Sequence, residues 1–331
     1  NNTITLNDQL SPTMTITASE GSDGFTSNDA TLSLTFTSSE ATSNFAVGDI
    51  TVSNGALSSF NESSSTVYTA TFTPTADGAV TIDVAGSTFT DASSNNNSAA
   101  TQFNWTFDST GPTMTIIAAE GSDGFTSKDA TLALTFTSNE ATTNFAVGDI
   151  TVTNGALSSF NASSSTVYTA TFTPTTDGAV TIDVAGSTFT DASSNNNSAA
   201  TQFNWTFDGS VPTITSTTIA FDNSTIAVTF SEAVYNTTGG SGALETSDFA
   251  LSISGGTATV GSTPSSISIS GNVYTLGLTL TGTPDGSETL TVVPSSSTAI
   301  YDGVNNAAST TQSNNTVALN EKIIPTVTFS P

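Results

Sequence analysis

The chain lacks three residue types on which much of protein chemistry depends. Its 331 residues include no histidine, no cysteine and no arginine, and only Lys128 and Lys322 oppose 28 acidic residues. Without histidine or cysteine there is no thiolate, no imidazole base and no nitrogen or sulfur ligand for zinc. A glycosidase with two carboxylates is the one catalytic chemistry left, and solvated surface acids explain the same residues more simply. We therefore expect no enzyme.

The shortage of positive charge also limits the partners. A net charge of −26 leaves no basic surface that could neutralise phosphates, which excludes nucleic acid and disfavours an anionic membrane surface. No run of residues is long and apolar enough to span a membrane, so we expect no direct membrane insertion of this segment. The absence of cysteine fits a secreted bacterial-type protein without disulfides, and we expect an extracellular location, on the cell surface or secreted.

Internal repetition is the strongest pattern in the sequence. Residues 12–108 align without gaps to residues 112–208, with nine differences in 97 positions, and residues 212–320 form a divergent third copy. The predicted divisions are the tail of a preceding domain with its linker at 1–11, repeats at 12–110, 111–210 and 211–322, and the start of a next domain at 323–331.

Each repeat carries the two-residue period of half-buried strands. The run ATLSLTF puts Leu32, Leu34 and Phe36 on one face, and turn signals such as NG, DG and proline separate it from similar runs. Seven strands fit the first repeat, at 12–18, 30–37, 45–53, 56–60, 66–73, 79–90 and 101–107. About a hundred residues, seven strands and no helical pattern predict a two-sheet immunoglobulin-like sandwich. The expected fold class is all-β, with tandem immunoglobulin-like β-sandwich domains arranged end to end.

An acidic residue stands four positions before a Pro-Thr pair once per domain length, as Asp8, Asp108, Asp208 and Glu321. If successive strands reverse direction, loops after odd-numbered strands lie at the trailing end of a domain and loops after even-numbered strands at its leading end. Acids of both neighbours then surround each linker. The predicted groups are Asp8 with Glu40 and Asp91; Asp108 with Glu20, Asp23, Asp77, Glu140 and Asp191; and Asp208 with Glu120, Asp123, Asp177, Glu232 and Asp302.

Carboxylates gathered so densely repel one another unless a cation lies between them. Calcium accepts six to eight oxygen ligands in irregular geometry, whereas magnesium demands a stricter octahedron. We therefore expect structural calcium at the interdomain joints, and these fifteen acids are its candidate ligands. The alternative is a set of solvated loop acids that only keep the chain soluble.

Several motifs resemble a known family. They are TF-x-x-x-E-A, F-x-x-x-D-I-T-V-x-N-G, Y-x-A-x-F-x-P-x-x-D-G, D-A-x-x-N and F-D-x-x-x-P-T. They resemble the bacterial Ig-like (Big) repeats in the extender regions of giant surface adhesins, including the calcium-stiffened RTX type. The resemblance is strong over 12–210 and weaker over 211–320. It implies a stalk that projects a distal binding domain from a cell, with calcium at the domain junctions.

In that comparison the linker acid matches Asp108 and Asp208, and the late-loop acid matches Asp91, Asp191 and Asp302. The chain departs from the family pattern where Gly, Val, Ser or Ile precedes the linker proline, where Glu321 replaces Asp, and where SSNNN replaces a D-x-x-G-N turn.

The expected function is a non-catalytic extracellular spacer, the calcium-rigidified stalk of a bacterial cell-surface adhesin, whose partners are neighbouring Ig-like domains of the same chain. A subunit of a surface layer or extracellular filament, with lateral self-association, is the alternative. A glycan-binding module is less favoured, because Trp105 and Trp205 each share a strand face with two phenylalanines and are expected in the core.

Overall fold

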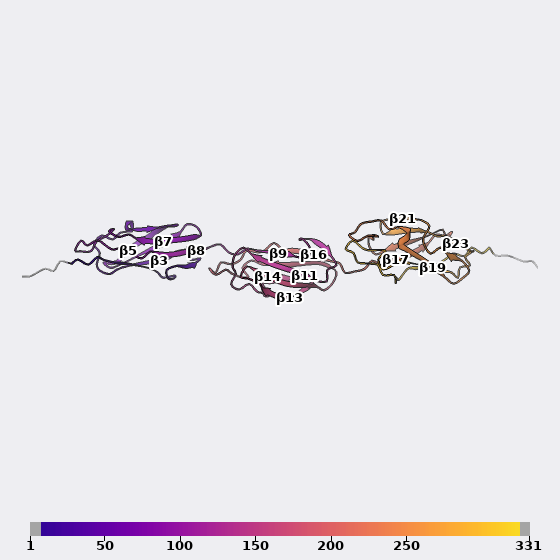
Figure 1. Ribbon diagram of the computed structural model, residues 1–331, viewed down its shortest axis with the longest axis horizontal. Coiled ribbons are helices and arrows are strands. Elements are labelled where there is room, and N and C mark those ends of the chain that lie inside the picture. Colours follow the sequence, from indigo (N-terminus) through magenta and orange to yellow (C-terminus); the bar gives the residue numbers. More distant parts are fainter. Residues whose placement is uncertain (1–7, 325–331) are drawn as a thin grey trace, which may run out of the picture.

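The computed structural model describes residues 8–324, and these form three β-sandwiches that follow one another in a row (Figure 1). This arrangement confirms the predicted all-β class and the end-to-end order of the domains. The predicted tail of a preceding domain and the start of a next one lie mostly outside the described residues. Within that part of the chain, no helix is long and apolar enough to cross a membrane.

The first sandwich consists of two four-stranded sheets. One has the order β1-β3-β6-β5 and the other β2-β8-β7-β4. Their strands are β1 (Met14–Ala18), β2 (Phe25–Ser27), β3 (Leu32–Ser38), β4 (Ile50–Val52), β5 (Gly55–Ser64), β6 (Val67–Pro74), β7 (Gly78–Val84) and β8 (Phe103–Phe107). Paired strands are antiparallel except β2 and β8, which are parallel. A short 3-10 turn, η1 (Val47–Asp49), precedes β4.

The second sandwich repeats this plan, as the near-identity of the two sequences requires. Its sheets are β9-β11-β14-β13 and β10-β16-β15-β12. The elements are β9 (Met114–Ala118), β10 (Phe125–Ser127), β11 (Leu132–Ser138), η2 (Val147–Asp149), β12 (Ile150–Val152), β13 (Gly155–Ala162), β14 (Val167–Pro174), β15 (Gly178–Val184) and β16 (Phe203–Phe207).

The third sandwich is less regular. It has a four-stranded sheet β17-β18-β22-β21, a three-stranded sheet β19-β24-β25 and a small pair β20-β23. The elements are β17 (Ile214–Ile219), β18 (Thr225–Phe230), η3 (Thr246–Asp248), β19 (Phe249–Ser254), β20 (Thr259–Val260), β21 (Ile267–Ser270), β22 (Val273–Gly277), β23 (Leu280–Thr281), β24 (Thr289–Pro294) and β25 (Thr316–Ala318).

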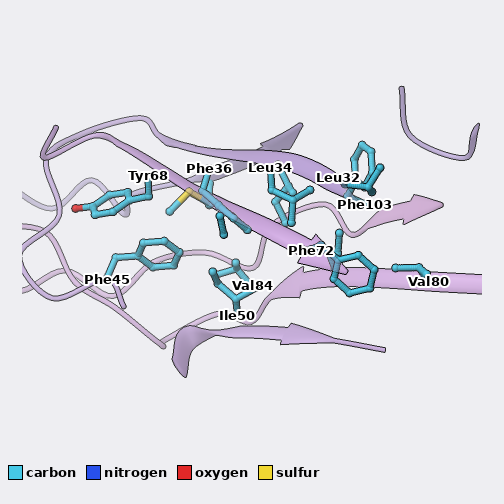
Figure 2. Packing of buried hydrophobic residues seen from close by; sticks show 14 of the residues in the cluster. Leu32, Leu34, Phe36, Phe45, Ile50, Tyr68, Phe72, Val80, Val84 and Phe103 are labelled. Atoms are coloured by element: carbon cyan, nitrogen blue, oxygen red, sulfur yellow. The ribbon is translucent and has the colours of Figure 1, made fainter. Parts of the chain in front are cut away.

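Each sandwich has its own core, and the alternating pattern of the strands fills it. Figure 2 shows Leu32, Leu34 and Phe36 pointing from β3 between the two sheets of the first domain, where all three are buried. Trp105 is 1% exposed and stacks on Phe25 with ring centroids 5.9 Å apart. The expectation that both tryptophans are core residues is confirmed, since Trp205 is equally buried.

Two of the predicted strands are markedly shorter in the structure, and one strand is absent from the prediction. The strand expected at 45–53 begins only at Ile50, because the Asp49 carboxylate accepts the Ala46 N–H and closes the 3-10 turn. The strand expected at 79–90 ends at Val84, because the Asn97 side chain accepts the N–H groups beyond it and folds this segment into a loop. The strand β2 was not predicted at all, since three residues are too few to show an alternating pattern.

Candidate metal centres at the domain junctions

The unpredicted strand β2 decides which acids reach a joint. It lies parallel to β8 with Ser27 opposite Phe107, the residue just before the linker, and the Asp108 N–H donates to the Ser27 carbonyl at 3.1 Å. The segment after β1 therefore does not turn back at the end of the domain. It crosses to the other sheet, and β2 continues to the trailing end.

Glu20 and Asp23 lie in this crossing segment and are bound within their own domain. Both Glu20 oxygens accept the Ser33 N–H at 3.0 Å, and Asp23 Oδ1 accepts the Asn104 N–H at 2.7 Å. Asn104 precedes Asp108 by four residues of extended chain, which is about 13 Å. These two acids, and Glu120 and Asp123 in the second repeat, therefore do not gather around the linkers as predicted.

Nine of the fifteen candidate acids do come together, in three groups of the same composition. In each group one carboxylate oxygen per residue lies within 4.8 Å of the others. The groups are Asp8, Glu40 and Asp91; Asp108, Glu140 and Asp191; and Asp208, Glu232 and Asp302. Each combines a linker aspartate with two acids of the domain that follows it. We call them the leading, first-joint and second-joint triads.

A loop with an Asp-x-x-x-Asn pattern positions the late acid of each triad. Asp191 is 4% exposed, and its Oδ1 accepts the Asn195 N–H at 2.8 Å. The Asn195 side-chain amide then donates both to Asp191 Oδ2 and to the Asp108 backbone carbonyl, each at 2.9 Å. One asparagine thus shapes the loop and ties it to the linker.

The other two triads have the same asparagine. Asn95 donates to the Asp8 carbonyl at 3.1 Å, and Asn306 donates to the Asp208 carbonyl at 2.8 Å. Sequence reasoning did not assign a site role to these asparagines. The signal was present, because an asparagine follows the late acid by four positions in all three repeats.

Burial and neighbouring charges raise the pKa of all three triad glutamates and of the linker acid Asp208. Burial, and then the charges of Asp191 and Asp108, raise the pKa of Glu140. Burial, and then Asp8 and Asp91, likewise raise the pKa of Glu40. The pKa of Glu232 is also raised by burial and by its two triad neighbours.

Two of these glutamates hold an oxygen without a partner. The Oε1 atoms of Glu40 and Glu140 are buried and have no hydrogen-bond partner among the described residues. A buried carboxylate oxygen without a donor is costly and normally finds one. Its position beside two further carboxylates fits a cation ligand.

The remaining two candidates, Asp77 and Asp177, do not join the triads but accept hydrogen bonds from the linkers. Asp77 Oδ1 accepts the N–H and the hydroxyl of Ser109, at 2.8 and 2.7 Å, and Oδ2 accepts the Thr110 hydroxyl at 2.5 Å. Asp177 accepts the Gly209 N–H at 2.7 Å and the Ser210 hydroxyl. Their carboxylates are thus already engaged by the residues that follow each linker acid.

The donor set of the triads defines what they can hold. Two ligands of one calcium ion, each 2.3–2.6 Å from it, lie at most about 5 Å apart, and the 4.8 Å limit falls within this range. All the donors are oxygens, which favours a hard cation over zinc or copper. Three acidic triads at domain junctions can therefore hold metal ions.

Comparisons with known proteins point to one family. The family model of the bacterial Ig-like domain matches residues 5–107 and 108–207, which is more than half of the chain. A search of the curated proteins found no match.

Several solved structures of bacterial surface proteins are similar at low identity. The Escherichia coli adhesin FdeC has 14% identity, covers 95% of this chain and 97% of its own, and gives a TM-score of 0.36. InvD of Yersinia pseudotuberculosis has 15% identity, coverages of 93% and 97%, and a TM-score of 0.36. Invasin, a bacterial integrin-binding protein, has 16% identity, coverages of 85% and 56%, and a TM-score of 0.34.

The family match spans the two near-identical sandwiches and two of the three linker acids, Asp8 and Asp108. The chain belongs to the bacterial Ig-like domain family.

Proposed function

We propose that this chain is a non-catalytic extracellular spacer, the calcium-stiffened stalk of a bacterial cell-surface adhesin of the RTX extender type. The resemblance of its repeats to adhesin extender repeats and the row of sandwiches in Figure 1 support this proposal. Its partners are then the neighbouring Ig-like domains of the same chain. The function is mechanical, since the chain holds a distal domain away from the cell.

The observation that carries the calcium proposal is the recurrence of one triad at successive junctions, with a buried and unpartnered Glu Oε1 in two of the three. Each triad joins a linker residue to the next domain, so an ion bound there would fix the linker against that domain. Asp108, for example, would be held to Glu140 and Asp191. Bending at the joint would then require breaking ligand bonds.

Calcium suits these triads better than magnesium does. Three carboxylates supply up to six oxygens, and calcium accepts six to eight ligands at flexible angles. Magnesium keeps several of its waters and needs near-ideal octahedral geometry, which a site shared between two domains supplies less readily. The bound cation would also offset the repulsion that raises the pKa of Glu140.

Titration calorimetry tests the metal site directly. The wild type is expected to bind calcium, and Asp108→Asn should weaken binding at the first joint at least about tenfold while the second joint stays intact, because the two triads share no residue. Glu62→Ala is the matched control. Glu62 is an exposed strand acid remote from the joints, and Ala162 already occupies its place in the second repeat.

Small-angle scattering tests the mechanical function. With calcium the particle should be a stiff rod, and chelation should increase bending between domains without unfolding them. Wild-type protein that binds no calcium at millimolar concentration would refute the proposal, as would an Asp108→Asn variant that binds like the wild type. A radius of gyration near roughly 20 Å, the value for a compact chain of this length, would also refute it.

A further inference from the structure

In each of the first two sandwiches, the side chain at one equivalent position contacts the domain that follows. Asn28 Nδ2 donates to Asn195 Oδ1 at 3.1 Å across the first joint. Lys128, which occupies the same position in the second repeat, donates from Nζ to the Asn305 backbone carbonyl across the second joint. Both side chains follow the short strand that continues to the trailing end of the domain, β2 or β10.

The two side chains contact the same loop of the following domain. Asn195 and Asn305 both lie in the loop that starts at the late triad acid, Asp191 or Asp302. Asn305 has φ of 77°, and in this left-handed conformation its carbonyl accepts the lysine ammonium. The contact is therefore made to the loop that shapes the triad, but not to the triad acids themselves.

The linkers differ in a way that matches the lengths of the two side chains. A Cβ atom built on Gly111 would lie 2.0 Å from the Asn196 carbonyl oxygen, so only glycine allows this close approach of linker and loop. The second joint has Val211 at the same place, which is 45% exposed and cannot approach in that way. The short Asn28 thus accompanies the linker with Gly111, and the long Lys128 accompanies the linker with Val211.

We propose that the side chain at position 28 or 128 is an interdomain latch that fixes the orientation of consecutive sandwiches, and that Lys128 holds the second joint without any metal. A linker and a triad beside it fix one point of a joint and leave rotation about that point. A second contact away from the linker removes this rotation. The proposal does not depend on calcium, because neither contact uses a triad carboxylate.

The two latches differ in strength. The Lys128 contact has a charged donor, and hydrogen bonds to charged groups are worth more than neutral ones such as Asn28 to Asn195. Lys128 is also one of only two basic residues in a chain with 28 acidic ones. After removal of metal, the second joint should therefore keep its orientation better than the first.

Distance measurements between spin labels in chelator test the latch. Because the chain has no native cysteine, labels can be placed without background on exposed residues. Ser58→Cys with Ser158→Cys reports on the first joint, and Ser158→Cys with Ser268→Cys reports on the second. The variants are Lys128→Met, which keeps the chain length without the donor, and Lys128→Asn, which is folded in the first repeat as Asn28.

Both variants are expected to broaden the second-joint distribution, with about a tenfold loss of the closed population, as the lower end of the range for a hydrogen bond to a charged group would give. Lys322→Met removes the same charge at the far end of the third sandwich and should change nothing at this joint. Asn28→Ala should broaden the first joint by less. Unchanged widths in both Lys128 variants, or a wild-type second joint no narrower than the first, would overturn the proposal. Calcium binding is not measured here, so failure of the latch and failure of the calcium sites are distinguishable.

Discussion

The two joints between the described domains share a set of hydrogen bonds and differ in other interdomain contacts. In both, an asparagine of the following domain donates to the carbonyl of the linker aspartate, and an acid of the preceding domain grips the next linker residues. The first and second joints differ at several positions of the linker and the late loop, among them Ser109 against Gly209. Three of the differences are Asn28 against Lys128, Gly111 against Val211, and Ser193 against Val304.

The comparison shows which contacts define a joint and which adjust it. The shared contacts come from short side chains that hydrogen-bond to the linker backbone, such as Asn195 and Asp77. The differing positions lie on the domain ends and in the linker, where a substitution leaves the sandwich core unchanged. Joints of one array can therefore differ in stiffness while the domains keep the same fold.

The largest expected effect concerns the late acids of the two joint triads, Asp302 and Asp191. Asp302 is fully buried, its Oδ1 accepts the N–H groups of Val304 and Asn306 at 2.9 and 2.8 Å, and its Oδ2 accepts the Asn306 amide. Asp302→Asn puts a donor against these donors and should lower the free energy of unfolding of the third sandwich by about 3 kcal/mol. Asp191→Asn should act on the second sandwich in the same direction. Denaturant unfolding in chelator measures both.

The exposed acid Glu245 of the third sandwich provides the control, since Glu245→Gln should change stability by less than about 0.5 kcal/mol. If Asp302→Asn were no more harmful than this control, the buried carboxylate would not organise its loop.

The next effect should reverse sign with calcium. Glu140→Gln removes a charge that is repelled by Asp191 and Asp108, so without metal the second sandwich should gain roughly 0.5–1 kcal/mol. With calcium the same variant loses a ligand and should be less stable than the wild type. Glu232→Gln should show a smaller gain in chelator, because Glu232 Oε1 already accepts the Ser231 hydroxyl at 3.5 Å. Thermal melts with and without calcium give the sign of the stability change in each variant. If Glu140→Gln changed stability in the same direction with and without calcium, a metal role for Glu140 would be contradicted.

The meeting of the three triads could be predicted from the sequence because it depends only on strand direction. The sequence predicts seven strands that reverse direction in turn, and the first sandwich has eight. The result survives because β2 continues onward beside β8 without reversing the chain, so every later loop stays at its predicted end. Repetition at Asp108 and Asp208 then marked the linker acids.

The rest of the site could not be predicted, for two physical reasons. A strand of three residues shows no periodicity, so β2 could not be predicted from the sequence. Without β2, the sequence does not show that the preceding segment crosses to the other sheet and holds Glu20 and Asp23 away from the joint. The sequence also shows a carboxylate without showing whether its oxygens are already bound. Asp77 lies beside the linker as predicted, but the linker hydroxyls and N–H already occupy its oxygens.

A smaller effect concerns the hydrogen bonds of Asp77 and Asp177 to the linkers and their dependence on pH. Hydrogen bonds from Thr110 and Ser109 lower the pKa of Asp77, and those from Ser210 and Gly209 lower the pKa of Asp177. A lowered pKa in the folded state means that the stabilisation is present above the unfolded value of about 3.9 and is lost as the pH falls through the folded value. The hydrogen bonds of Asp77 and Asp177 to the metal-free linkers should therefore weaken on acidification below about pH 4.

Asp77→Ala should loosen the first joint already at neutral pH and reduce its response to acid, and Asp177→Ala should do the same at the second joint. Because the Lys128 contact holds the second joint independently of Asp177, the second joint should loosen less than the first, both in the variants and on acidification. Spin-label distance widths at neutral and acidic pH provide the measurement. Equal acid responses in Asp77→Ala and the wild type would show that another group controls the opening.

The smallest expected effect tests the third difference between the joints. The Ser193 hydroxyl donates to Asp108 Oδ2 at 2.8 Å and so orients the linker carboxylate toward its triad, whereas Val304 offers the second joint no such donor. Ser193→Val should lower the calcium affinity of the first joint about threefold to fivefold, because the carboxylate must then be ordered at the moment of binding. Val304→Ser should raise the affinity of the second joint by a similar factor. Calorimetry on both variants measures the change. If neither substitution changed the calcium affinity, the triad geometry would orient the linker aspartate without this hydrogen bond.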